Sequence, residues 1–304
     1  MSLKEKNNDL NQKCAPSKNY KDGSCFTYES LKKIANAYNL KASNNKINTD
    51  TVNKKDLVHD LENKLKTNCD NQVCWLRQDF IKKIESDEIS KNTFRPEGPQ
   101  KKYDWLSTTH INEVIDQYHN VHKNFRFLGA VPIDFDDLPV LGLCDLNLEN
   151  LESEGINKIG IVFNLDEHYK DGSHWVALFS DLENYQTYFF DSYGKKPDRR
   201  IRRFISRIVK HMYKKKYNKK LSVKEVLEYL KKDKKKLINN SIIKNLQGFD
   251  IDYNKIRHQY KNSECGVYSI NFILELLDGK TFHHIVNNKT YDDEMNTNRK
   301  IYFR

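Results

Sequence analysis

Apolar residues recur at helical spacing through the first third of the chain. One set lies within 31–38 and a second within 57–65, with a polar stretch, 43–53, between them. A repeat of three to four residues is typical of a helix that buries one face. The pattern therefore predicts a helix, an extended segment, a second helix and then a third helix around 75–84. We expect residues 1–92 to form an N-terminal helical arm domain.

Helix-breaking residues separate this arm from the larger second part of the chain. Residues 94–99 read Phe-Arg-Pro-Glu-Gly-Pro, a composition typical of a linker. Beyond them the apolar period predicts helices at 107–118, 199–220, 221–236 and 267–277, and strands at 159–163, 174–180, 185–190 and 251–257. We expect 93–304 to be an α+β core in which helices flank a mixed, mainly antiparallel central sheet. A basic helical insertion occupies about 195–250.

The two strands after residue 173 bring a histidine and an aspartate together. A hairpin whose turn is 181–184 places His174 directly opposite Asp191. Opposed residues project to one face with Cβ atoms about 5 Å apart, so the carboxylate can orient the imidazole. Trp175 then lies opposite Phe190 on the other face. Because both faces are apolar, we expect this hairpin inside a covered sheet.

Cys265 directly precedes an apolar helix. The unpaired N–H groups and the dipole of a helix N-terminus favour a thiolate over a thiol. Gln259, six residues earlier, can donate an amide hydrogen bond to an oxyanion, with the Cys265 backbone N–H as second donor. Gly266 permits the close approach of a substrate. With His174 and Asp191, these residues are the parts of a thiol nucleophile and its base. A buried core cysteine is the alternative.

The spacing of the other cysteines is weaker evidence for a functional site. The chain has six cysteines and no apolar signal segment at its start, which indicates reduced thiols rather than a disulfide framework. Four fall in the arm, spaced C-x10-C and C-x4-C: Cys14, Cys25, Cys69 and Cys74. Four thiolates can hold a structural zinc, although neither half has the usual C-x2-C spacing, and buried free thiols are the alternative. No apolar window approaches the roughly 18 residues of a membrane span.

The chain is strongly basic. Charged residues make up 31% of it and the formal net charge is +10. This balance favours polyanionic partners such as nucleic acid, although a solvated Lys-rich surface gives the same numbers. The insertion carries a dense basic group, Arg199, Arg200, Arg202 and Arg203. The helix-extended-helix pattern of the arm is similar to SAP-type DNA-binding modules, and a helical packing arm is the simpler interpretation.

Several segments together resemble the ubiquitin-like-protein protease superfamily, which includes SUMO proteases and adenovirus proteinase. They are Gly172-Ser173-His174-Trp175, Phe190-Asp191-Ser192 and Gln259-x5-Cys265-Gly266, in the family's order of His, Asp, Gln and Cys. Trp105-Leu106-Ser107 before a helix is similar to the family's Trp-Leu-Asn-Asp helix, with Ser107-Thr108 in place of Asn-Asp. The tract 256–259 and the tail 292–304 look like the polyprotein-processing protease of African swine fever virus and its relatives in large DNA viruses.

The resemblance implies hydrolysis of a peptide or isopeptide bond through a thioester on Cys265, without a metal or organic cofactor. It makes His174 the base, Asp191 the carboxylate that orients it and Gln259 the oxyanion donor. Trp105 and Trp175 match the two tryptophans that clamp a narrow Gly-Gly tunnel in the family. A bulky residue in that tunnel would clash, which implies cleavage after Gly-Gly.

Three functions follow as hypotheses. The first is a viral endopeptidase that cleaves structural polyproteins at Gly-Gly-X during virion maturation, in the virion and the host cytoplasm, with possible non-specific DNA contact. The second is an isopeptidase that deconjugates SUMO or ubiquitin. The third is a nucleic-acid-binding protein whose protease-like core is inert, with the insertion arginines as its contact. The scissile sequence, the oligomeric state, any activating DNA or peptide and the role of the arm remain open.

Overall fold

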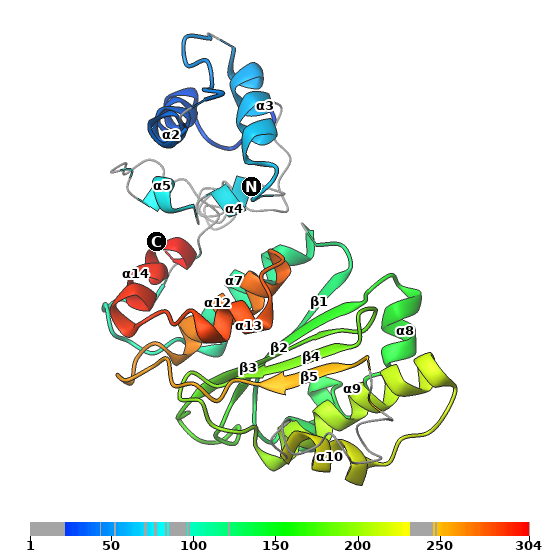
Figure 1. Ribbon diagram of the computed structural model, residues 1–304. Helices are drawn as coiled ribbons and strands as arrows, with labels where there is room; N and C mark the ends of the chain where they lie inside the picture. The colour runs from blue at the N-terminus through cyan, green and yellow to red at the C-terminus, as the bar shows by residue number, and fades with distance from the viewer. Residues whose placement is uncertain are drawn as a thin grey trace, which may run out of the picture.

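The computed structural model describes residues 22–303 apart from 43, 52, 70–71, 76–77, 83, 85–95, 97, 121, 232–245 and 247. In Figure 1 the helical arm lies at one end of the molecule, beside the C-terminal helix, and the sheet lies at the other. Half of the predicted linker, 94–99, and the residues before it back to 85 lie outside the described residues, so the boundary at residue 92 stays a prediction. The apolar cluster of the arm continues into the core, because Trp75 and Ile81 belong to the same buried cluster as Leu106.

The arm contains the two predicted helices, which pack their apolar faces together. They are α2 (Tyr28–Lys41) and α3 (Lys54–Leu65), and the predicted third helix is present as two short ones, α4 (Gln72–Trp75) and α5 (Asp79–Lys82). Thr27 and Asn53 cap α2 and α3, each accepting a backbone N–H through its side chain. The helical period of the sequence therefore located the first two helices and their buried faces.

The core is built on a five-stranded mixed sheet with the order β1-β2-β3-β4-β5. The strands are β1 (Phe125–Pro132), β2 (Lys158–Asn164), β3 (Trp175–Asp181), β4 (Gln186–Phe190) and β5 (Asp250–Tyr253). The two central pairs, β2 with β3 and β3 with β4, are antiparallel, whereas β1 with β2 and β4 with β5 are parallel. The α+β class and the mixed sheet flanked by helices are thus confirmed. Strand β1 was not predicted.

Helices cover both faces of this sheet (Figure 1). One face packs against α7 (Thr108–Ile115) and α12 (Cys265–Leu277), and the other against α9 (Arg199–Tyr217) and α10 (Val223–Lys231). Strand β3 is buried at every position, and its residues alternate between the two apolar clusters. The predicted covered hairpin is confirmed, because side chains on both faces of a central strand must be apolar.

The β3–β4 hairpin differs from its predicted register by two residues. Ala177 pairs with Phe190, so the turn is 182–185 and position 174 corresponds to 193 rather than to 191. The predicted Trp175–Phe190 pair is therefore wrong. Tyr185, at the end of the turn, has a φ of +56°, which places the turn one residue later than its polar residues indicate. A shift of two residues keeps every side chain on its predicted face, because the side-chain period of a strand is two.

The remaining helices complete the two outer layers. They are α8 (Leu148–Ser153), α13 (Phe282–Asn287) and α14 (Asp292–Tyr302), with 3-10 turns η1 (Asp116–Asn120), η2 (Phe135–Asp137) and η3 (Pro139–Leu141). Ser107 caps α7 by accepting the His110 N–H. Through the described ranges of the chain, no helix combines the length and the apolar character that a bilayer crossing needs.

Candidate active site

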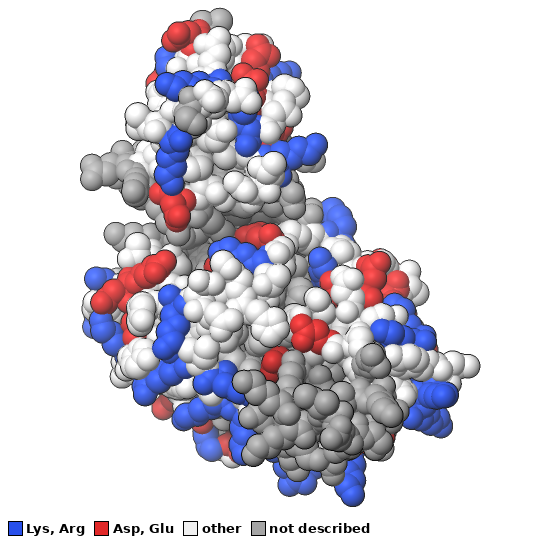
Figure 2. Space-filling model, viewed as in Figure 1, with Lys and Arg blue, Asp and Glu red and all other residues white. Residues whose placement is uncertain are grey.

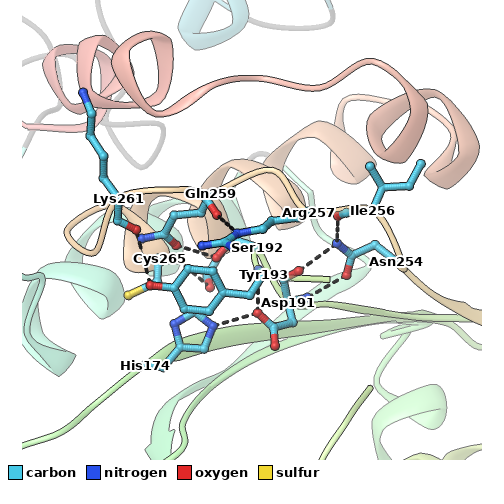
Figure 3. Close-up of polar contacts among 11 residues, drawn as sticks. His174, Asp191, Ser192, Tyr193, Asn254, Ile256, Arg257, Gln259, Lys261 and Cys265 are labelled. Atoms are coloured by element: carbon cyan, nitrogen blue, oxygen red, sulfur yellow. Dashed lines mark hydrogen bonds and ion pairs between the residues drawn. The ribbon is translucent and has the colours of Figure 1, made fainter. Parts of the chain in front are cut away.

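His174 and Asp191 meet beside the hairpin, at neighbouring ends of its two strands. His174 precedes β3 and Asp191 follows β4, and their Nε2 and Oδ1 atoms are 2.7 Å apart. The same Oδ1 accepts the Tyr193 backbone N–H at 2.8 Å, so one oxygen holds both groups. The predicted meeting of His174 with Asp191 is present, although the pairing is diagonal. The Tyr193 ring, in the turn after β4, stacks on the imidazole with centroids 4.5 Å apart (Figure 3).

A buried amide fixes the backbone of Asp191. Asn254, fully buried, follows β5 and accepts the Asp191 N–H at 2.8 Å through Oδ1. Its Nδ2 donates to the carbonyl oxygens of Asp191 at 2.7 Å and of Ile256 at 3.0 Å. Asn254 therefore joins the end of β4 to the segment that leads toward Cys265.

The environment of His174 favours its protonated form. Burial by itself lowers the pKa of His174, but hydrogen bonding to Asp191 and to Cys265, together with their negative charges, outweighs it and raises the pKa to about 9. Since Nε2 is bonded to Asp191, Nδ1 is the ring nitrogen left for Cys265. The imidazole is thus held between a carboxylate and a thiol, as a general base and acid must be.

Cys265 is the first residue of α12, which begins two residues before the predicted helix 267–277, and it is only 2% exposed. The preceding residue, Glu264, is fixed by the C-terminal helix α14. Arg299 Nε donates to Glu264 Oε2 at 2.7 Å, and both side chains are buried. Asn296 and Ser263 donate to the other carboxylate oxygen at 2.9 and 2.8 Å. The position of the thiol along its helix axis therefore depends on contacts from the end of the chain.

Gln259 has an amide donor that is buried without a hydrogen-bond partner among the described residues. Its carbonyl oxygen Oε1 accepts the Ser192 hydroxyl at 2.6 Å, which fixes which way the amide points. The Ser192 carbonyl also accepts the N–H groups of His258 and Gln259, at 2.8 and 2.9 Å. An orphan buried donor costs about 1–3 kcal/mol, which an anionic ligand would recover. Nε2 is therefore a donor held ready for a negatively charged atom.

A hydrogen bond ties Trp175 to Leu106, the residue that follows Trp105 in the chain. Trp175 is buried and donates its indole N–H to the Leu106 carbonyl at 2.8 Å, whereas Trp105 is 43% exposed. A Cβ at Gly266 would lie 2.9 Å from the Leu106 side chain, so the packing of Leu106 by itself requires a glycine here. The close packing of α12 on the segment before α7 explains why position 266 is a glycine. The expected approach of a substrate to Gly266 stays a prediction.

The cysteine expectations for the arm are corrected by the structure. Cys25 and Cys69 are disulfide-bonded, so neither is a reduced thiol or a zinc ligand. Cys14 and the Cys74 side chain lie outside the described residues. Across the described part of the chain, no group of three metal-binding side chains comes together. The pairing of sulfurs depends on which of them the arm helices bring within reach, and spacing along the chain does not report that distance.

The insertion arginines differ in their exposure and in whether they pair with acidic residues of the protein. Arg200 pairs with Asp136 and with Asp137, the latter at 2.6 Å, so its charge is neutralised within the protein. Arg199 and Arg203 are exposed and Arg202 is half-buried. Further along α9, Lys214 and Lys215 pair with Glu149 and Glu152 at 2.9 and 2.6 Å. Much of the basic stretch therefore anchors α9 to the acidic helix α8.

The Ulp1 protease family, C-terminal catalytic domain, matches residues 157–303. A protein of Acanthamoeba polyphaga mimivirus that bears the name of a thiol protease is 35% identical over 309 residues, covering 96% of this chain and 93% of its own. The chain belongs to the Ulp1 protease family. This Ulp1-family protein is a cysteine protease of the viral type.

Two further relatives of this Ulp1-family protease come from African swine fever virus. The SUMO-1 cysteine protease of a Kenyan isolate of that virus is 23% identical over 271 residues, covering 82% of this chain and 88% of its own. The crystal structure of the African swine fever virus protease superposes with a TM-score of 0.51 at 21% identity, covering 83% of this chain and 89% of that one. This second comparison shows a shared fold.

Sequence reasoning missed several residues that position the site of this Ulp1-family protease. Asn254 and Ser192 act through backbone and amide contacts that no spacing reveals. Tyr193 follows Asp191 by two residues, so a register counted from the four-residue turn 182–185 would have placed it opposite His174. The Glu264–Arg299 pair joins residues 35 positions apart in the chain, which only the fold brings together.

Proposed function

We propose that this protein is a viral cysteine endopeptidase that cleaves structural polyproteins after Gly-Gly during virion maturation, with Cys265 as nucleophile. The observation that carries the proposal is the hydrogen bond of His174, whose imidazole is also bonded to the Asp191 carboxylate, to a thiol in the first turn of α12, Cys265. Gln259, six residues earlier in the chain, adds a buried amide donor with no partner among the described residues. Family membership makes peptide hydrolysis the natural reaction for them.

The chemistry follows from these positions. Before the attack the Cys265 proton lies on His174 Nδ1, in agreement with the raised pKa of the imidazole, and the sulfur then attacks the carbonyl carbon of the scissile bond. The carbonyl oxygen becomes an oxyanion that accepts hydrogen bonds from Gln259 Nε2 and the Cys265 N–H. The tetrahedral carbon then expels the amine, which takes the proton from His174, and a thioester remains.

Water completes the cycle by attacking the thioester carbonyl. His174 accepts a proton from that water, and collapse of the second tetrahedral intermediate releases the acid and restores the sulfur of Cys265. Asp191 keeps the imidazole in the tautomer that presents Nδ1 to the sulfur throughout. A pKa of about 9 for His174 supports its part as the acid, because the ring holds a proton at neutral pH.

The preference for Gly-Gly is supported by the neighbourhood of Trp105. Trp105 is partly exposed, and Trp175 ties the adjoining Leu106 carbonyl to the start of β3. Leu106 in turn packs on Gly266, the residue after the nucleophile. We expect these rings to narrow the approach to the thiol, and therefore small side chains before the scissile bond.

The test is incubation with the structural polyproteins of the same virus, with cut sites read by mass spectrometry. Cleavage after Gly-Gly is expected from the parent protein and its complete loss from Cys265→Ala. Cys144→Ala is the matched control, because Cys144 is a free cysteine in an intermediate environment away from His174. Retained cleavage by Cys265→Ala, or equal loss in Cys144→Ala, would contradict the assignment of the nucleophile.

Deconjugation of a ubiquitin-like protein is a second candidate, favoured by the name of the African swine fever virus relative, a SUMO-1 cysteine protease. The chemistry at Cys265 would be the same, with a lysine amine as leaving group. A SUMO or ubiquitin vinyl-sulfone probe separates the two. Rapid labelling of Cys265 by the folded modifier, but not by a short Gly-Gly peptide, would favour deconjugation.

A further inference from the structure

Cations and aromatic rings alternate along one edge of the site. Lys195 Nζ lies 5.6 Å from the centroid of the Tyr193 ring, and the Arg257 guanidinium lies 5.3 Å from the same ring. Arg257 also lies 4.9 Å from the Tyr260 ring, over which Lys289 Nζ lies at 5.7 Å. We call these five residues the cation–aromatic row. Such contacts hold positive charges in place on a surface at little cost in solvation.

The row begins at the imidazole of the site. Tyr193 stacks on His174, and its hydroxyl donates to the Lys261 carbonyl at 3.3 Å (Figure 3). Arg257 Nε donates to the Gln259 carbonyl at 2.7 Å. The row is therefore attached to both the base and the loop of the oxyanion donor. Because His174 delivers its proton to the leaving amine, the chain that follows the scissile bond departs past His174 and toward Tyr193.

Within the part of the chain that the structure describes, the cations of the row have no acidic partners. Among the described residues, no carboxylate lies within ion-pair distance of Lys195, Arg257 or Lys289, whereas neighbouring Lys261 pairs with Asp293 at 2.6 Å. Blue side chains gather in Figure 2 around the edge where the β5–α12 connection runs in Figure 1. Unpaired charges that protrude beside a reactive centre attract ligands of the opposite sign.

The occupied ring faces argue for a peptide rather than for nucleic acid. Single-stranded nucleic acid binds to surfaces of this composition by stacking its bases on free aromatic faces. Tyr193 has His174 stacked on its ring and two cations near it, and the Tyr260 ring, 55% exposed, has Arg257 and Lys289 over it. The row presents positive charge to the solvent, and this charge attracts carboxylates.

We propose that the cation–aromatic row binds an acidic segment of the protein substrate directly after the scissile bond. This inference rests on the proposed protease function and adds to it the charge of the leaving half. It assigns a specificity role to Lys195 and Lys289, which touch no group of the reacting centre.

The experiment compares peptides that share one Gly-Gly acyl half. Their leaving halves carry three Glu, three Gln or three Lys residues, and a fourth peptide carries the three Glu residues before Gly-Gly instead. The kcat/KM values are measured at low and at high salt. Since exposed ion pairs contribute modestly, three of them predict that the parent prefers the acidic leaving half over the neutral one by about tenfold at low salt. High salt should shrink this preference.

The double variant Lys195→Gln/Lys289→Gln should reduce the preference to roughly twofold and leave cleavage of the neutral peptide unchanged. Lys196→Gln is the matched control, because it removes an adjacent exposed charge that lies over no ring of the row. Arg257 is kept, since it also holds the Gln259 carbonyl.

The outcomes separate the two claims. If the parent protein cleaves none of the peptides, the proposed protease function is contradicted. If it cleaves the acidic and the neutral leaving halves equally, only the role of the cation–aromatic row is contradicted. The inference is also overturned if Glu before Gly-Gly gives the larger gain, or if Lys196→Gln acts as strongly as the double variant. Single-stranded DNA binding that the double variant abolishes, with the peptide preference intact, would reassign the row to nucleic acid.

Discussion

The buried pair between Glu264 and Arg299 gives a sharp test of how the thiol is positioned. Arg299→Met keeps a long apolar stem and removes the guanidinium, leaving the Glu264 carboxylate, 1% exposed, without its cation. Removal of one partner of a buried ion pair costs about 3–5 kcal/mol, because the other charge stays buried and unpaired. For a chain of this size each kcal/mol lowers the Tm by about 2–4 °C, so a fall of roughly 6–20 °C is expected.

The assay is urea unfolding followed by circular dichroism, with kcat/KM measured on the same preparations. Glu264→Gln/Arg299→Met should recover much of the lost stability, since a neutral amide can stay bonded to Asn296 and Ser263 without a cation. Arg203→Met, at an exposed position on α9, is the control and should change the unfolding free energy by less than about 0.5 kcal/mol. A loss below about 1 kcal/mol in Arg299→Met, with no recovery in the double variant, would refute the reasoning.

Other predictions follow from single contacts. Asn254→Ala frees the backbone of Asp191 and should lower kcat by about 10- to 100-fold with little change in KM, measured on a Gly-Gly peptide; an unchanged kcat would remove Asn254 from the positioning network. The raised pKa of His174 stabilises the fold fully below its ordinary value of 6.5, and this contribution is lost as the pH rises through about 9. Urea midpoints measured from pH 6 to 10 should therefore fall more in the parent than in Asp191→Asn, and parallel curves would contradict the coupling. If α9 contacts DNA, Arg199→Glu/Arg203→Glu should weaken binding and flatten its salt dependence in fluorescence titrations, whereas unaltered binding would leave these arginines as solvated charges.

Much of the site could be predicted because its residues belong to local patterns. The alternation of apolar residues on either side of the turn places His174 and Asp191 on one face, and a register error of two residues preserves that result. Cys265 was located by the switch from polar residues to an apolar helix, which is a signal within one segment. Gln259 followed from its distance to that cysteine along a short connection.

The parts that escaped prediction depend on contacts between distant segments. Strand β1 carries a glycine with a φ of +100°, Gly129, and its register with β2 shifts between Phe127 and Ala130, so its period is irregular. Arg299 and Asn254 reach the site only after the tail and β5 have packed. The disulfide bonding of Cys25 and Cys69 likewise depends on the packing of the arm helices rather than on spacing.

Covalent trapping measures the central claim directly. A peptide vinyl sulfone ending in Gly-Gly should add once to the folded protein, and peptide mapping should place the adduct on Cys265. The adduct should be absent from Cys265→Ala and slowed in His174→Ala, with Cys144→Ala labelled at the parent rate. An adduct on Cys144, or labelling of Cys265→Ala at the parent rate, would contradict Cys265 as the nucleophile.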